Sequence, residues 1–305
     1  MECSLSGDGG AIKAMRNARL VICGLGYSGT AVARAALAAG LQVTATSRDP
    51  GGARPPAGVD IVGFEAAGAA LAHATHVLAT APPGEDGDPV LIRYHALLHD
   101  SKALRWAGYL STTGVYGDRG GAWVDEDTPV HPHAERARRR VAAEQQWAAL
   151  GGHVAVDLFR VAGIYGPGRS VLDDIRAGKS RRVIKPGHAF GRIHRDDIAG
   201  AVMAAIRQGH GPGVRVLHLA DDLPEESAVV IEEAARLLGV PPPPAIAYAD
   251  AVGSMGEMAR SFWADNRKVA SKLTQERLGY RWRYPDYRSG LAGILAEERI
   301  EGASE

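Results

Sequence analysis

A glycine-rich segment between two apolar stretches constrains the fold of this chain more than any other feature. The segment occupies residues 24–29 and follows the apolar run 19–23, which predicts a buried strand. The Ala- and Leu-rich run 30–39 comes next and predicts a helix that ends at Gly40. A strand, a GxGxxG loop and a helix in this order predict a dinucleotide-binding loop.

Each glycine of this loop has its own physical reason. Gly24 permits the tight turn, Gly26 lets the backbone approach a pyrophosphate, and Gly29 lets the helix pack on the strand. The free N–H groups at the start of the helix then face the phosphates. The alternative is a glycine-rich turn that binds no ligand. We expect six cofactor contacts here: Gly24, Leu25, Gly26, Tyr27, Ser28 and Gly29.

Strands and helices alternate along the rest of the chain. Further strands are predicted at 41–46, 60–63, 76–81, 107–111, 153–159 and 215–220, and helices at 90–99, 135–150, 171–178, 197–208 and 226–238. Residues 182–193 predict a hairpin or loop, and the four prolines 241–244 predict an extended connector. The alternation predicts an α/β fold with a Rossmann, doubly wound, mainly parallel sheet and a small C-terminal substrate-binding lobe.

The same pattern divides the chain into three parts. Residues 1–17 are expected to form a flexible N-terminal tail, in which Met15 is an alternative start, and which lacks the apolar core of a signal peptide. Residues 18–163 and 189–222 are expected to form the NAD(P)-binding domain. Residues 164–188 and 223–305 are expected to form the substrate-binding lobe.

Charge and composition exclude several classes of protein. The 305 residues include 35 Lys+Arg and 35 Asp+Glu, and this zero net charge argues against a nucleic-acid-binding protein. No apolar run reaches the roughly 18 residues that span a bilayer. Two cysteines cannot form a disulfide framework. His95 and His99 have no third ligand at useful spacing, so no metal is expected. We expect a cytoplasmic protein without a nucleic-acid or membrane partner.

The end of the second predicted strand bears on the choice of cofactor. An NAD-specific site has an acidic residue there, whereas this chain has Ser47 and Arg48 and places Asp49 beyond them. A hydroxyl and a guanidinium suit a 2′-phosphate, so we expect NADP in preference to NAD. The alternative is a solvated Arg48. Ala81 and Pro82, where the strand 76–81 ends, are further expected cofactor contacts.

Three later segments follow predicted strands or open a helix. They read STTGVYG at 111–117, RVAGIYGPG at 160–168 and RIHRDDIA at 192–199. In this order and spacing they resemble the extended short-chain dehydrogenase/reductase superfamily, in its NAD-dependent epimerase/dehydratase family. The resemblance runs from about Arg19 to the end of the chain. The GxGxxG loop, in place of the usual GxxGxxG, is most similar to the atypical branch of YeeZ-like proteins.

The resemblance implies a catalytic Ser or Thr, a Tyr and a Lys. Thr112, five residues before the Gly of VYG, takes the first place and would hydrogen-bond the substrate oxygen. Arg136 and Arg140 hold the YxxxK places, and an Arg is a poor proton shuttle because it stays protonated. Arg140 would hold the ribose next to the nicotinamide. Thr113 and Gly114 replace the acidic pair of the dehydratases, so we do not expect elimination chemistry.

Other side chains are candidates for the proton donor that the missing Tyr would have been. Tyr116 is one, although the family usually uses it for packing. His131, His133 and His194 are others, because His titrates near neutral pH. A structural or surface role is the alternative for each of them. The catalytic candidates are therefore Thr112, Tyr116 and Arg140.

The expected substrate side of the site is basic. Six cations lie within one loop and the start of one helix: Arg169, Arg181, Arg182, Lys185, Arg192 and Arg195. An anionic small molecule would suit them, and a solvated basic loop is the alternative. The expected substrate-binding residues are Tyr165, Arg169, Arg192 and His194.

Two functions fit these residues. The first is an NADP-dependent oxidoreductase or epimerase that acts on a small, anionic or sugar-like substrate. The second is a catalytically degenerate NADP(H)-binding sensor or regulatory protein on the same fold. As the resemblance implies, we also expect a homodimer that packs through the helices 90–99 and 135–150.

Overall fold

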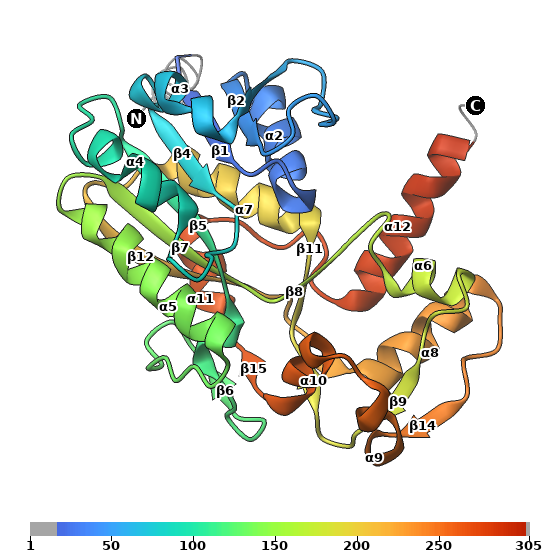
Figure 1. The fold of residues 1–305 in the computed structure, drawn as a ribbon. Coiled ribbons are helices and arrows are strands. Elements are labelled where there is room, and N and C mark those ends of the chain that lie inside the picture. The colour runs from blue at the N-terminus through green and yellow to red at the C-terminus, as the bar shows by residue number, and fades with distance from the viewer. Residues whose placement is uncertain (1–16, 303–305) are drawn as a thin grey trace, which may run out of the picture.

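The computed structural model describes residues 17–302 (Figure 1). A larger body is built on one central sheet, and a smaller lobe lies beside it. The predicted tail 1–17 falls outside the described residues except for Asn17, so it stays a prediction.

Seven strands form the central sheet in the order β12-β7-β5-β4-β1-β2-β3, and every pairing is parallel. They are β1 (Arg19–Cys23), β2 (Gln42–Ser47), β3 (Val59–Gly63), β4 (His76–Ala79), β5 (Trp106–Thr112), β7 (Ala155–Val161) and β12 (Gly213–Leu219). The strand order reverses between β1 and β4. In such sheets ligands bind at the carboxyl ends of the strands near this reversal. The predicted doubly wound α/β fold is confirmed.

Helices cover both faces of this sheet. On one face α2 (Tyr27–Ala38) packs against α7 (Arg195–Gln208). Alternate residues of β1, Leu20 and Ile22, point into the core beneath these two helices. The residues between them, Val21 and Cys23, point into a second core on the opposite face. The helices of that face are α3 (Gly68–Ala72), α4 (Pro89–His99) and α5 (Glu135–Ala148).

The lobe has a small apolar core of its own, formed by Leu172, Val230, Ala234, Tyr287, Leu291 and Ile294 together with Tyr165. Its helices are α6 (Val171–Arg176), α8 (Ser227–Leu238), α9 (Tyr248–Ala251), α10 (Glu257–Ala264) and α12 (Tyr287–Gly302). Its short strands are β9 (Arg182–Ile184), β10 (Ala189–Phe190), β13 (Glu225–Glu226) and β14 (Ala245–Ala247).

Short 3-10 turns occur in both parts of the molecule. They are η1 (Phe64–Ala66), η2 (Thr113–Tyr116), η3 (Ala149–Gly152) and η4 (Val252–Ser254).

Two connections join the lobe to the larger body. The strands β8 (Gly163–Tyr165) and β11 (Arg192–His194) pair in parallel. Further along, β15 (Lys268–Val269) pairs with β6 (Trp123–Val124), and α11 (Lys272–Leu278) packs against α7 and β12. Part of the segment 223–305 therefore contacts the larger body, and the predicted division into domains stays a prediction.

One local prediction is wrong. Residues 182–193 were expected to form a hairpin or loop, but they form three short strands with three separate partners. β9 pairs with β14, β10 with β13, and β11 with β8. These partners lie elsewhere in the chain, so local sequence does not specify the pairing. The helix expected from residue 30 also begins earlier, at Tyr27.

Within residues 17–302 the structure shows neither a membrane-spanning helix nor a cluster of metal ligands. No helix in this range is both long and apolar enough to span a bilayer. Nor does this range bring three His, Cys, Asp or Glu side chains together as a metal site would need.

Candidate active site

The loop after β1 has the geometry that a dinucleotide loop needs. Gly24 has a φ of +110°, and a Cβ there would lie 2.7 Å from Thr80 Oγ1. A Cβ on Gly29 would collide with the carbonyl oxygen of Gly24. A Cβ on Gly26 would meet nothing within 4 Å. The fold itself therefore requires Gly24 and Gly29, whereas Gly26 leaves open space beside the backbone.

Neighbouring strands hold this loop in place. The Gly24 N–H donates to Thr46 Oγ1 at 3.1 Å, and Thr80 Oγ1 donates to the Gly24 carbonyl at 2.6 Å. The helix α2 begins directly after Gly26, and no side chain caps its first N–H groups. Those N–H groups and the positive end of the helix dipole are thus available to an anion. The residues present fit a bound pyrophosphate.

At the end of β2 the nearest carboxylate, Asp49, is exposed and has one oxygen bonded within its own loop. Asp49 Oδ1 accepts the Gly52 N–H at 3.1 Å, which turns this carboxylate back into its own loop. Ser47 Oγ donates to the Asp49 carbonyl at 2.9 Å. Arg48 is exposed. No hydrogen bond or ion pair joins its side chain to the described part of the chain.

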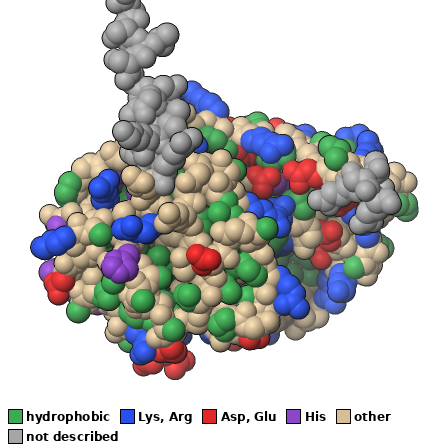
Figure 2. Space-filling view, turned by 90° about the horizontal axis from the view of Figure 1, so that it is seen from above, with side chains coloured by type: hydrophobic (Ala, Val, Ile, Leu, Met, Phe, Trp, Pro, Cys, Tyr) green, Lys and Arg blue, Asp and Glu red, His purple; other side chains and the backbone are tan. Residues whose placement is uncertain are grey.

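A cleft of about 730 Å³ lies between the carboxyl ends of the strands and the lobe. Figure 2 shows a hollow between the larger body and the lobe, with both basic and acidic side chains around it. Six predicted site residues line the cleft: Pro82, Thr112, Arg140, Tyr165, Arg169 and Arg192. The structure thus brings residues from separate segments of the chain to one place.

Thr112 is the last residue of β5 and faces this cleft. Its Oγ1 accepts the Gly114 N–H at 3.1 Å, which fixes the side chain at the start of η2. Ser111 also lines the cleft, but its hydroxyl donates to the buried Glu144 at 2.5 Å. Thr112 and the more deeply buried Thr113, which also lines the cleft, are the hydroxyls of this segment that donate to no other described residue.

Arginines occupy both places where the family has its Tyr and Lys. Arg140 Nη1 donates to the Leu110 carbonyl at 2.6 Å and to the Tyr109 hydroxyl at 3.2 Å, so Arg140 is held beside the end of β5. Arg136 lines the cleft one helical turn earlier, and its guanidinium lies 4.5 Å from the centre of the Phe262 ring. Neither can take a proton at ordinary pH.

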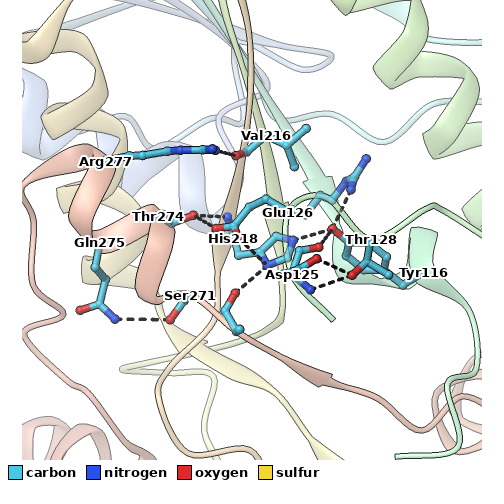
Figure 3. Close-up of polar contacts among 12 residues, drawn as sticks. Tyr116, Asp125, Glu126, Thr128, Val216, His218, Ser271, Thr274, Gln275 and Arg277 are labelled. Atoms are coloured by element: carbon cyan, nitrogen blue, oxygen red, sulfur yellow. Dashed lines mark hydrogen bonds and ion pairs between the residues drawn. The ribbon is translucent and has the colours of Figure 1, made fainter. Parts of the chain in front are cut away.

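Tyr116 lies outside the residues that line the cleft. Its side chain is completely buried, and its hydroxyl lies 2.5 Å from His218 Nε2 and 3.0 Å from the Asp125 carbonyl. Arg160 donates to the same hydroxyl. Figure 3 shows Tyr116 directed toward His218 and Asp125. Burial raises the pKa of Tyr116 to about 12. We therefore assign Tyr116 no catalytic role.

The histidine candidates also lie outside the cleft lining. His194 is completely buried; it caps α7, packs edge-on against Tyr165 and lies tilted against Tyr284. Burial lowers the pKa of His194 to about 4, so this ring is neutral near neutral pH. His131 and His133 are exposed and contact each other. The proton donor that would replace the missing Tyr is thus none of these three.

Tyr27 links the glycine loop to the lobe side of the cleft. Its hydroxyl donates to the Pro167 carbonyl at 2.9 Å. The guanidinium groups of Arg169 and Arg195 lie 5.5 and 5.3 Å from the centre of its ring. A cation near an aromatic face at these distances is attracted to it. The loop that begins the larger body's first helix is therefore attached to the loop between β8 and α6.

Sequence reasoning missed one wall of the cleft. It comes from α10 and the residues after it: Met258, Phe262, Trp263, Asp265 and Arg267. This stretch has no motif. The pairing of β15 with β6 and hydrogen bonds such as that of Arg267 to the Gly117 carbonyl bring it to the site. An aromatic and basic composition near the C-terminus was the only signal for it in the sequence.

Comparisons with known proteins agree with this architecture. A solved structure of a conserved protein of Silicibacter pomeroyi, described as functionally unknown, is 41% identical and has a TM-score of 0.85, covering 92% of this chain and 99% of that one. A Methylobacillus flagellatus structure, provisionally named an NAD-dependent epimerase/dehydratase, is 25% identical with a TM-score of 0.72, covering 93% and 99%.

Two curated proteins are similar at the sequence level. A Streptomyces protein named 3-diazoavenalumate denitrifying reductase is 27% identical over 233 residues, which are 72% of this chain and 76% of that protein. Protein YeeZ of Escherichia coli K12 is 28% identical over 180 residues, 58% of each chain. No protein-family model matches the sequence.

Proposed function

Because the chain belongs to the NAD-dependent epimerase/dehydratase family of short-chain dehydrogenases/reductases, in its atypical YeeZ-like branch, we propose that it is an NADP-dependent oxidoreductase or epimerase. Its substrate in this proposal is small and anionic. One observation carries the proposal: the glycine loop, with open space at Gly26, and Thr112 lie at the same edge of the sheet. Thr112 lines a basic cleft, and Tyr27 of the glycine loop contacts Arg169, which lines the same cleft.

In this proposal the cofactor extends from the glycine loop to the cleft. A nicotinamide cofactor, when bound, supplies the hydride chemistry. The backbone of residues 24–29 would hold its pyrophosphate, and Arg48 its 2′-phosphate. Ser47 would join Arg48 by exchanging the hydrogen bond that its hydroxyl donates to the Asp49 carbonyl for one to the 2′-phosphate. Ala81 and Pro82 would border it where β4 ends. Arg140, whose position beside β5 is set by two hydrogen bonds, would hold the ribose next to the nicotinamide.

The substrate in this proposal lies against Thr112. The Thr112 hydroxyl would donate a hydrogen bond to the reacting oxygen and so orient the carbon that exchanges hydride. Arg169 and Arg192 would make the substrate side of the cleft basic, and Tyr165 would form a wall. The reductase name of the Streptomyces relative supports redox chemistry at such a site.

The cofactor assignment is tested with Arg48→Ala. We expect NADPH affinity to fall about tenfold because a charge-assisted contact to the 2′-phosphate is lost, while NADH affinity stays the same. Arg54→Ala, in the same exposed loop, is the control and should leave both affinities unchanged. Quenching of protein fluorescence during titration measures each affinity. Tighter binding of NADH than of NADPH to the native protein would overturn the NADP preference.

The sensor alternative is favoured by one observation, the Arg at position 136 where the family has its proton-transferring Tyr. Turnover distinguishes the two functions. Oxidation of NADPH is followed by absorbance with a panel of ketones, oxo acids and sugar nucleotides. We expect turnover that Thr112→Ala lowers about 100-fold and Thr112→Ser retains, since Ser keeps the hydroxyl. Tight NADPH binding with no turnover on any substrate would support the sensor instead.

We also propose a cytoplasmic homodimer that packs through α4 and α5. Ile92 of α4 is 59% exposed, which supports an apolar contact there. Sedimentation of the native protein and of Ile92→Glu tests this contact. We expect a dimer that the added charge dissociates. A native monomer at micromolar concentration would contradict it.

A further inference from the structure

Two guanidinium groups that the proposed function does not use line the same cleft as Thr112. Arg136 comes from the start of α5, and Arg267 comes from the segment between α10 and β15. Arg136 makes a ring contact with Phe262 and no hydrogen bond to any described residue. Its N–H donors are thus available to a ligand.

Arg267 is held in a fixed position with part of its donor set free. Its Nη1 donates to the Gly117 carbonyl at 2.9 Å and to Asp265 Oδ2 at 3.1 Å. Its Nε is buried and has no hydrogen-bond partner among the described residues. A buried donor without a partner costs free energy unless a ligand or water satisfies it.

Gly114 keeps the space between Arg267 and Thr112 open. A Cβ at position 114 would lie 3.3 Å from Thr112 Oγ1 and 3.9 Å from Arg267 Nη2. The hydroxyl and the guanidinium therefore border one small space. A ligand that bonds to both must carry its anionic group only a few bonds from the oxygen that Thr112 holds.

The two guanidiniums near this space differ in how well they are balanced by carboxylates. Asp265 is paired with Arg267, and the charge of Asp118 also acts on Arg267. No ion pair joins Arg136 to a carboxylate among the described residues. Burial lowers the pKa of Arg267, and the charge of Arg136 lowers it further, so the two guanidiniums repel each other across the cleft. A carboxylate between them would relieve this repulsion and supply the partner that Arg136 lacks.

The remaining walls near this space are aromatic. Phe262 is 51% exposed although it is a large apolar side chain, and it lies under the Arg136 guanidinium. Trp263 packs edge-on against Phe190, with ring centres 4.9 Å apart, and both line the cleft. Such walls favour a flat apolar body on the ligand.

We propose that Arg136 and Arg267 bind the carboxylate of a small aromatic acid whose reacting oxygen is held by Thr112. The substrate class is thus an aryl acid with an oxo or hydroxyl group next to its carboxylate. This inference rests on the proposed function, because it places the carboxylate beside the carbon that exchanges hydride. It gives Arg136 a role in substrate binding in place of the proton transfer of the family's Tyr.

Calorimetric titration of the full chain, saturated with NADP+, tests the inference with two matched probes. Phenylpyruvate carries the carboxylate, and phenylacetone has a methyl group in its place. We expect the native protein to bind phenylpyruvate at least about tenfold more tightly. Arg136→Gln and Arg267→Gln should each remove most of that difference and leave phenylacetone binding unchanged. Arg138→Gln, on the same helix but outside the cleft, is the control.

The outcomes separate this inference from the proposed function. Equal affinity for the two probes, or no phenylpyruvate binding, in a protein that binds NADP+ normally overturns the inference alone. Tighter binding of phenyl phosphate than of phenylpyruvate overturns the choice of a carboxylate. If Arg267→Gln fails to fold, Arg136→Gln decides, since the Arg136 side chain makes no hydrogen bond to the described residues that the substitution could remove. NADP+ titration of the same samples tests separately whether the protein binds the cofactor, as the proposed function requires.

Discussion

Single residues in the glycine loop have separable roles, and two matched substitutions distinguish them. Gly29→Ala should destabilise the protein by about 1–3 kcal/mol, because its Cβ would collide with the Gly24 carbonyl and the close-packed loop cannot relax freely. Gly26→Ala should leave thermal stability unchanged but weaken NADP+ binding, because its Cβ enters open space where the proposed pyrophosphate lies. Thermal melting with and without NADP+ measures both. Equal melting temperatures for the two variants would contradict this assignment.

The burial of His194 predicts how the stability of the protein depends on pH. Its pKa is about 4 in the folded protein and about 6.5 in an unfolded chain. Between these values the unfolded chain binds more protons, so the contribution of His194 to stability is lost as the pH falls from about 6.5 to 4. The first-turn Asp196, 3.7 Å away, opposes this shift only in part.

His194→Asn isolates this effect, because Asn can cap α7 but does not titrate. We expect the free energy of unfolding of the native protein to drop by up to about 3 kcal/mol more than that of the variant between pH 7 and 4. Urea unfolding at several pH values measures the difference. His76, whose pKa is also lowered by burial, is present in both proteins and cancels. Parallel pH profiles would show that His194 is not the group responsible.

Residues whose role depends on adjacent backbone could be predicted from the sequence, whereas residues whose role depends on distant segments could not. Gly24 and Gly29 could be predicted because a turn and a close approach depend on adjacent backbone. The direction of Tyr116 could not, because it depends on His218 from a distant strand. Arg267 could not be predicted either, since no motif marks it and only folding brings it to Gly114.

Among the elements, α10 is a weakly anchored helix bordering the cleft. No residue of α10 is buried, whereas α8 in the same lobe buries five. Few buried contacts imply a low free energy of local opening. We expect amide hydrogens of α10 to exchange at least about tenfold faster than those of α8, and phenylpyruvate to slow exchange in α10 only. Mass spectrometry of exchanged peptides measures this. Equal protection of both helices would contradict it.

The elements also show which parts of the fold a hydrophobic sequence pattern can predict. The strands of the central sheet are apolar runs between helices, so both their existence and the doubly wound class can be predicted from periodicity. The strands β9, β10 and β11 have two or three residues each and pair with separate segments. For such strands the partner decides the structure, and local sequence carries little of that information.

At the scale of the whole molecule, Tyr27 joins the glycine loop to the lobe, so the two parts should respond together. NADP+ binding should reduce amide exchange in residues 165–169, because the proposed pyrophosphate site and the Pro167 contact share this side chain. Tyr27→Ala should abolish that response. Exchange in α3, which packs on the face of the central sheet opposite α2, serves as the internal control. A response of residues 165–169 that persists in the variant would show that another contact carries it.

This attachment has a kinetic consequence. Arg169 borders the substrate cleft and also lies over the Tyr27 ring, so a cofactor bound at the glycine loop would act on that part of the cleft through Tyr27. The two ligands should then add in a compulsory sequence, with NADPH first and the oxo acid second. In product inhibition we expect NADP+ to compete with NADPH and the product hydroxy acid not to compete with the oxo acid, which identifies NADP+ as the last species to leave.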